Sequence, residues 1–112
     1  GFCKFGGESW LLAASDLGAS GCMGFYGRPG AAKEVVDKMV CPILILAAGA
    51  DRATSPEENA AFDRALTESG KEHEYVVYEG APHSFFDRSF GDWASACDDA
   101  WGRMLGFIDR NR

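Results

Sequence analysis

One unbroken apolar run at residues 42–48 (PILILAA) constrains the fold of this chain more than any other feature. The run has the length of a strand, and its apolar residues do not alternate with polar ones. Continuous apolarity is typical of a strand covered on both faces, as in the middle of a parallel sheet. We therefore expect a layered protein with this strand at its centre.

The segments around this run alternate between strand and helix patterns, which indicates βαβ units. In chain order we expect a helix beginning near residues 4–7, a strand at 19–26, a helix at 31–39, a helix from 55, a strand at 75–78 and a helix from 92. Ser55, Pro56 and Glu58 form a typical helix start with a capping box. Gly70 is placed to end that helix.

The last segment is the best amphipathic helix of the chain. Its apolar residues recur at helical spacing: Trp93, Ala96, Cys97, Ala100, Trp101, Met104, Leu105 and Ile108. We expect this stripe, with its two tryptophans, to pack on a face of the sheet. Asp92 can cap the start of the helix, and Arg103 and Arg110 suit its end electrostatically.

Length and charge exclude several classes of protein. The 112 residues make one domain at most, and the net charge of −6 disfavours binding to nucleic acid or to anionic lipid. No apolar run approaches the roughly 20 residues of a membrane-spanning helix.

The scattered cysteines (Cys3, Cys22, Cys41 and Cys97) favour reduced thiols in the cytoplasm over a disulfide framework. We expect no metal site, because His73 and His83 lack metal-type spacing to any cysteine pair.

The first of three loops that carry chemistry is residues 1–7 (GFCKFGG). Small residues around Cys3 suit a sharp strand-to-helix turn that presents a nucleophile. The following helix N-terminus would favour a thiolate, and the Lys4 N–H would be one oxyanion-hole donor. Taken alone, Cys3 could equally be a buried structural cysteine. Ser9 is a rival nucleophile, but no small residue follows it and it lies well inside the expected helix.

The other two loops follow the next two strands. Asp51 comes directly after the central strand, and His83 lies on a turn after the strand at 75–78. An aspartate there can hold the tautomer of a histidine on the neighbouring loop. An ordinary turn aspartate and a surface turn histidine are the alternatives. We expect His73, flanked by Glu72 and Glu74, to be solvated and inert.

The order nucleophile, acid, histidine is that of α/β-hydrolases. At these residues the chain resembles the dienelactone hydrolase family, over essentially its whole length. The stretches that carry the resemblance are GFC with the following GG, FYG at residues 25–27, PILILAAGAD, YEGAPHSFF and the closing helix with Ala100, Trp101, Arg103, Leu105 and Phe107.

The resemblance implies a partial α/β-hydrolase fold, in which residues 1–112 form the C-terminal portion and the N-terminal half is missing. It also implies a Cys3–His83–Asp51 triad that hydrolyses a small lactone or ester through an acyl-thioester, without a cofactor. Arg88 would match the family's substrate-binding arginine loosely, and Arg28 is a weaker candidate for the same role.

One departure concerns the sharp turn around the nucleophile, the nucleophile elbow, which in the family reads G-x-C-x-G-G. Phe5 stands here where the first following glycine is expected, as if one residue were inserted. We expect its side chain to crowd the turn.

The alternative to an enzyme is a catalytically incompetent half-domain that persists as a homodimer or by docking on a complementing N-terminal half.

Overall fold

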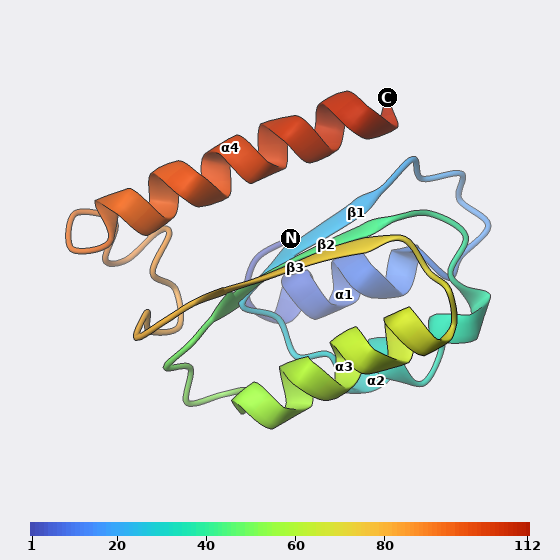
Figure 1. Cartoon of the computed structure of the whole chain (residues 1–112), viewed down its shortest axis with the longest axis horizontal. Coiled ribbons are helices and arrows are strands. Elements are labelled where there is room, and N and C mark those ends of the chain that lie inside the picture. The colour runs from blue at the N-terminus through green and yellow to red at the C-terminus, as the bar shows by residue number, and fades with distance from the viewer.

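The computed structural model describes all 112 residues. They form a parallel sheet with helices on both faces (Figure 1). The strands, in the order β1-β2-β3, are β1 (Cys22–Phe25), β2 (Ile43–Ala48) and β3 (His73–Tyr78). One face is covered by α4 (Ala94–Asn111), and the other by α1 (Lys4–Leu12), α2 (Gly30–Lys33) and α3 (Pro56–Glu68). The expected α/β class, with a parallel sheet flanked by helices, is confirmed.

β2 is the central strand, and every one of its residues is buried. Because side chains alternate along a strand, Leu44 and Leu46 join the core layer beneath α4. Ile43 and Ile45 join the opposite layer, together with Trp10 of α1. The central strand predicted from unbroken apolarity is therefore confirmed, and it connects two separate core layers.

α3 begins as its sequence predicts. The Glu58 N–H donates to Ser55 Oγ at 3.2 Å, and the Ser55 N–H donates to the Glu58 carboxylate at 2.8 Å. These two bonds complete the capping box, and Pro56 occupies the first turn. Gly70 follows the helix with φ +66°, a conformation that few residues other than glycine adopt readily.

Residues 31–39 form two short pieces rather than one helix. α2 ends at Lys33, and a single 3₁₀ turn follows at Val36–Lys38. The backbone of Val35 leaves the helical region (φ −120°), and Val36 and Met39 both reach the core beneath the sheet. The strand expected at 19–26 is also shorter, because only residues 22–25 pair with β2.

α4 has the expected length, but part of its predicted core stripe is wrong. Its inner face is formed by Cys97, Ala100 and Phe107, whereas three residues of the predicted stripe are about half exposed: Trp101, Leu105 and Ile108. The apolar residues occupy more of the helix circumference than the sheet covers. The predicted cap is also wrong, because the residue before the helix is Trp93 and no side chain caps it.

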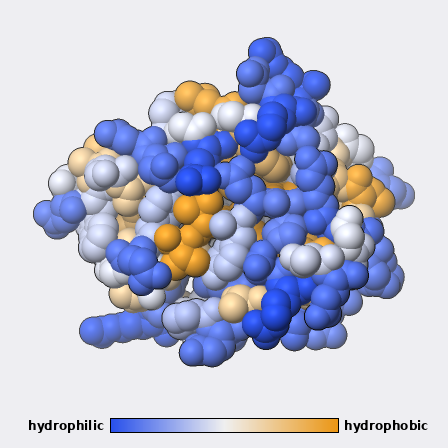
Figure 2. Space-filling model, in the orientation of Figure 1, coloured by the Kyte–Doolittle hydropathy of each residue, from blue (hydrophilic) through white to orange (hydrophobic).

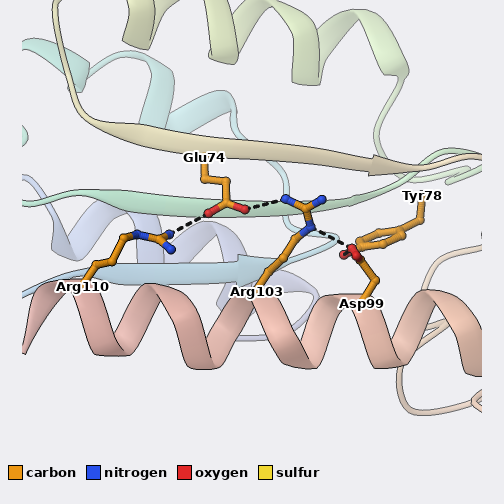
Figure 3. A network of polar contacts seen from close by, with 5 residues as sticks. All are labelled: Glu74, Tyr78, Asp99, Arg103 and Arg110. Atoms are coloured by element: carbon orange, nitrogen blue, oxygen red, sulfur yellow. Dashed lines mark hydrogen bonds and ion pairs between the residues drawn. The ribbon is translucent and has the colours of Figure 1, made fainter.

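A polar network joins α4 to the edge strand β3 (Figure 3). Glu74 of β3 accepts hydrogen bonds from Arg103 at 2.7 Å and from Arg110 at 2.9 Å. Asp99 accepts from Arg103 Nε and from the Tyr78 hydroxyl, both at 2.8 Å. These bonds lower the pKa of the Asp99 carboxyl. The network holds the last helix along the outer strand.

His73 differs from its predicted state. Its side chain is 13% exposed, its Nε2 lies 2.7 Å from Asp63 Oδ1, and its Nδ1 lies 2.8 Å from the carbonyl oxygen of Lys71. The prediction of a solvated histidine is therefore wrong, because the ring joins the start of β3 to α3.

The face of the molecule seen in Figure 2 is mostly hydrophilic. Small hydrophobic patches lie between the hydrophilic side chains. No helix is both long and apolar enough to cross a bilayer.

Candidate active site

The segment that leads to Cys3 runs beside β1. The Phe25 N–H donates to the carbonyl oxygen of Gly1, and the Cys3 N–H donates to the carbonyl oxygen of Phe25, both at 3.0 Å. Phe2 forms a parallel bridge with Phe25. α1 then begins at Lys4, so the chain turns from an extended segment into a helix at Cys3.

Cys3 has an unusual backbone, with φ 55° and ψ −126°. A non-glycine residue in such a sparsely populated region costs on the order of 1–3 kcal/mol, and strain of this kind clusters at functional sites. The turn places the Cys3 thiol at the N-terminus of α1. The Lys4 N–H belongs to the first helical residue and has no acceptor within the helix.

The extra residue in this turn does not crowd it. The side chain of Phe5 is 67% exposed. The close contacts are made by glycines: a Cβ on Gly1 would lie 2.0 Å from the carbonyl oxygen of Phe5, and a Cβ on Gly7 would lie 2.5 Å from that of Arg28. The expected crowding is therefore wrong, because the Phe5 side chain points to solvent, and the glycines that follow it pack against the backbone of Phe25 and Arg28.

Asp51 and His83 form a direct pair. Asp51 follows β2, and its Oδ2 lies 2.8 Å from His83 Nδ1. The Asp51 side chain is 2% exposed, and its other oxygen accepts from the Ala53 N–H at 2.7 Å. A buried carboxylate fixed in this way holds the proton on Nδ1, which leaves His83 Nε2 as an acceptor. The imidazole itself is 35% exposed and can reach a substrate.

The Cys3 thiol has a different partner. Its sulfur lies 3.6 Å from Ser84 Oγ, and it forms no hydrogen bond with His83. Cys3 and His83 nevertheless line the same cavity. The structure thus brings the predicted acid and base together, and it places the predicted nucleophile on the same cavity with its thiol turned to the residue after the histidine.

Tyr26 is a further residue of this site, and it is the middle residue of the FYG stretch. Its hydroxyl donates to Asp87 Oδ1 at 2.9 Å, and its ring centre lies 5.0 Å from that of His83. Burial and the bond to Asp87 raise the pKa of Tyr26, so its hydroxyl stays protonated at neutral pH. Its place directly after β1, at the carboxyl end of a parallel strand, is the signal that points to it.

Backbone strain marks the same place. The chain has three non-glycine residues with positive φ, namely Cys3, Tyr26 and Ser84. Cys3 and Tyr26 line the cavity, and Ser84 contacts the Cys3 thiol. Since such conformations persist only where the surroundings fix them, this concentration supports a functional role for the site.

The cavity has a volume of about 580 Å³. It is lined by Cys3, Lys4, Gly7, Glu8, Leu11, Tyr26, Arg28, Gly30, Ala31, Ala53 and His83. Two cations, Lys4 and Arg28, therefore border it, together with one carboxylate, Glu8. Arg88 is exposed and does not line this cavity, so its contact with a substrate stays a prediction. Ser9, the rival nucleophile, lies within α1 and is also outside the lining.

A family model and curated relatives show the family of this chain. The family model described as "Dienelactone hydrolase family" matches residues 1–111. A protein of Saccharolobus solfataricus assigned as a carboxymethylenebutenolidase is 36% identical over 98% of this chain and 42% of its own length. A protein of Escherichia coli K12 with the same assignment is 29% identical over 94% of this chain and 42% of its own length.

Solved structures show the same fold. A crystal structure assigned as a dienelactone hydrolase from Klebsiella pneumoniae superposes with a TM-score of 0.82 at 24% identity, over 95% of this chain and 48% of that one. A dienelactone hydrolase-like phosphotriesterase from metagenomic libraries superposes with a TM-score of 0.81 at 18% identity, over 99% of this chain and 50% of that one. The chain thus spans half or less of the length of these relatives and structures.

Proposed function

Because the chain belongs to the dienelactone hydrolase family, we propose that its Cys3, His83 and Asp51 hydrolyse a lactone or carboxylic ester through an acyl-thioester. The observation that carries this proposal is the 2.8 Å contact between Asp51 and His83 on the cavity that Cys3 also lines. A thiol at the start of a helix, on the same cavity as an imidazole fixed by a buried carboxylate, supplies the nucleophile and the base that such catalysis uses.

The reaction begins with a movement of the thiol. Rotation about its Cα–Cβ bond takes the Cys3 sulfur from Ser84 toward His83, whose Nε2 accepts the thiol proton. The thiolate attacks the carbonyl carbon of the substrate, and the developing oxyanion accepts a hydrogen bond from the Lys4 N–H. The carbon–oxygen bond to the alcohol or enol then breaks, and His83 returns the proton to the departing oxygen.

The second half of the reaction releases the acid. His83 takes a proton from water, and the resulting hydroxide attacks the thioester carbonyl. The carbon–sulfur bond breaks, the carboxylic acid leaves, and the Cys3 thiol is restored with the proton from His83. Asp51 stabilises the imidazolium at each stage and does not itself become protonated.

The charges around the cavity indicate the substrate class. Arg28 borders the cavity, and its guanidinium can pair with a carboxylate on the substrate. We therefore propose an ester or lactone that carries a carboxylate, as a dienelactone does. Arg88 remains the second candidate for this contact.

The test is turnover of p-nitrophenyl acetate by the polypeptide that carries this sequence. Cys3→Ala should lower kcat/KM at least about a thousandfold, because the nucleophile is lost. Ser9→Ala is the matched control and should change it less than about twofold, because Ser9 is a helix residue outside the cavity. Full activity in both Cys3→Ala and Cys3→Ser would overturn the assignment.

The family match favours this hydrolase over the alternative of an incompetent half-domain. Association through a homodimer or a complementing half stays a prediction. Size-exclusion chromatography distinguishes the cases: a species that turns over the ester agrees with the enzyme, and a stable dimer without turnover agrees with the docking alternative.

A further inference from the structure

Two cysteines outside the candidate active site lie next to each other. Cys22 begins β1, Cys41 precedes β2, and their sulfur atoms are 3.9 Å apart. This is the amino end of the two strands, whereas Tyr26 and Asp51 follow the carboxyl ends. The pair therefore lies at the opposite end of the strands from the Cys3 thiol, and the proposed hydrolysis does not use it.

We propose that Cys22 and Cys41 form a redox-active pair that a peroxide or a small-molecule disulfide converts into an intramolecular disulfide. The backbone around Cys22 is held by its pairing with the neighbouring strand. The Cys22 N–H donates to the carbonyl oxygen of Pro42 at 3.0 Å, and Cys22 is in register with Ile43 of the neighbouring strand. The sulfurs must approach to about 2.0 Å, which side-chain rotation can accomplish between adjacent strands.

The two thiols have different environments, which sets the order of events. Cys22 is 5% exposed and belongs to the core layer beneath α1, whereas Cys41 is only partly buried. Burial and the neighbouring Cys41 raise the pKa of Cys22 to about 12. Cys41 is therefore the thiol that an oxidant in solution meets first, and Cys22 resolves the product.

With a peroxide, the Cys41 thiolate attacks one oxygen, the O–O bond breaks, and Cys41 becomes a sulfenic acid. The Cys22 sulfur then attacks the Cys41 sulfur, the S–O bond breaks, and water leaves with the thiol proton. Together the two thiols lose two electrons and two protons, and hydrogen peroxide is reduced to water. With a small disulfide, Cys41 forms the mixed disulfide and Cys22 displaces the small thiol.

The bond would close a loop that contributes to the active-site cavity. Four lining residues, Tyr26, Arg28, Gly30 and Ala31, lie between the two cysteines in the sequence. A cross-link at the base of this loop restricts the unfolded chain and holds the cavity wall to the sheet. Oxidation should therefore stabilise the protein and spare the Asp51–His83 pair.

The experiment uses the polypeptide that carries this sequence, with Cys3→Ser, which removes the thiol expected to be most reactive. The protein is incubated with glutathione disulfide, alkylated under denaturing conditions and analysed by intact mass and peptide mapping. We expect one alkyl group within this sequence, on Cys97, a mass about 2 Da below that of the reduced chain with one alkyl group, and one peptide that links Cys22 to Cys41. The Tm should rise by roughly 5–15 °C in the oxidised form.

Cys41→Ser in the same background is the matched variant, and Cys22→Ala is a second one in case the first is poorly folded. In both, the mass loss and the difference in Tm between oxidised and reduced protein should disappear. A stable glutathione adduct on Cys41, or thiols that stay reduced, would overturn the proposal that Cys22 and Cys41 form a disulfide. A linked peptide with an unchanged Tm would overturn the stabilising role of the bond.

Discussion

Asp51 Oδ2 lies 2.8 Å from His83 Nδ1, and these two residues come from loops that follow neighbouring strands of the sheet. The aspartate is buried, and the imidazole faces a cavity. This contact fixes the ring in one tautomer and leaves Nε2 as an acceptor, which the proposed mechanism uses for proton transfer.

The first prediction concerns that contact. Asp51→Asn keeps the size of the side chain, but its amide can donate to His83 Nδ1 and so favour the wrong tautomer. We expect kcat for ester hydrolysis to fall by about a thousandfold or more, with little change in the circular dichroism spectrum. Asp63→Asn, at the His73 pair, is the matched control and should leave kcat nearly unchanged. A fall of less than about tenfold in Asp51→Asn would contradict the proposed role.

The second prediction concerns the resting position of the thiol. Ser84→Ala removes the hydroxyl that lies 3.6 Å from the Cys3 sulfur, so the thiol should reach His83 more often. The rate of alkylation of Cys3 by iodoacetamide should rise about two- to fivefold, as expected for the loss of one weak hydrogen bond. Ser89→Ala, in the same loop, serves as the control. A rate that stays the same or falls in Ser84→Ala would show that Ser84 does not hold the thiol away from the base.

The third prediction separates the two candidate arginines. Arg28→Gln should raise KM about tenfold for a p-nitrophenyl ester that carries a carboxylate, such as the hemisuccinate, because an ion pair is lost. The same variant should leave KM for neutral p-nitrophenyl acetate within about twofold. Arg88→Gln is the matched comparison, because Arg88 does not line the cavity. The opposite pattern would assign the substrate carboxylate to Arg88.

The fourth prediction concerns the network between β3 and α4 (Figure 3). Hydrogen bonds from Arg103 and Tyr78 lower the pKa of Asp99, so its stabilising effect is present at neutral pH and is lost as the pH falls through that lowered pKa. Asp99→Asn should reduce the free energy of unfolding in urea by about 1 kcal/mol or less near pH 7, because the side chains are partly exposed.

The difference between parent and Asp99→Asn should narrow as the pH falls from about 7 toward about 3. Asp109→Asn removes an outer ion pair at the end of the same helix and is the control. A difference that stays constant over this range would mean that the Asp99 charge does not contribute.

Much of the fold follows from local patterns in the sequence. The run at residues 42–48 and the capping box at Ser55 describe β2 and the start of α3, because burial on both faces and helix capping depend on neighbouring residues. The spacing on α4 gives its length, but not which side faces the sheet. Trp101 belongs to the predicted stripe and is about half exposed, whereas Phe107 lies outside that stripe and is buried, and only packing determines this difference.

The candidate site was partly predictable from the positions of its residues relative to the strands. Asp51 and His83 directly follow strands, so their meeting at one edge of a parallel sheet could be expected. The contact of the Cys3 thiol with Ser84 and that of Tyr26 with Asp87 join segments far apart in the chain. His73 shows the converse, since its acidic neighbours suggested solvent, whereas Asp63 of α3 holds it.

The most direct measurement is to trap the covalent intermediate. The protein is mixed with an activated ester, quenched with acid during turnover, digested and analysed by mass spectrometry. We expect the acyl group on the peptide that contains Cys3, and no acyl group in Cys3→Ala. An acyl group on Ser9 or another residue, or an unchanged adduct in Cys3→Ala, would contradict the assignment of Cys3 as the nucleophile.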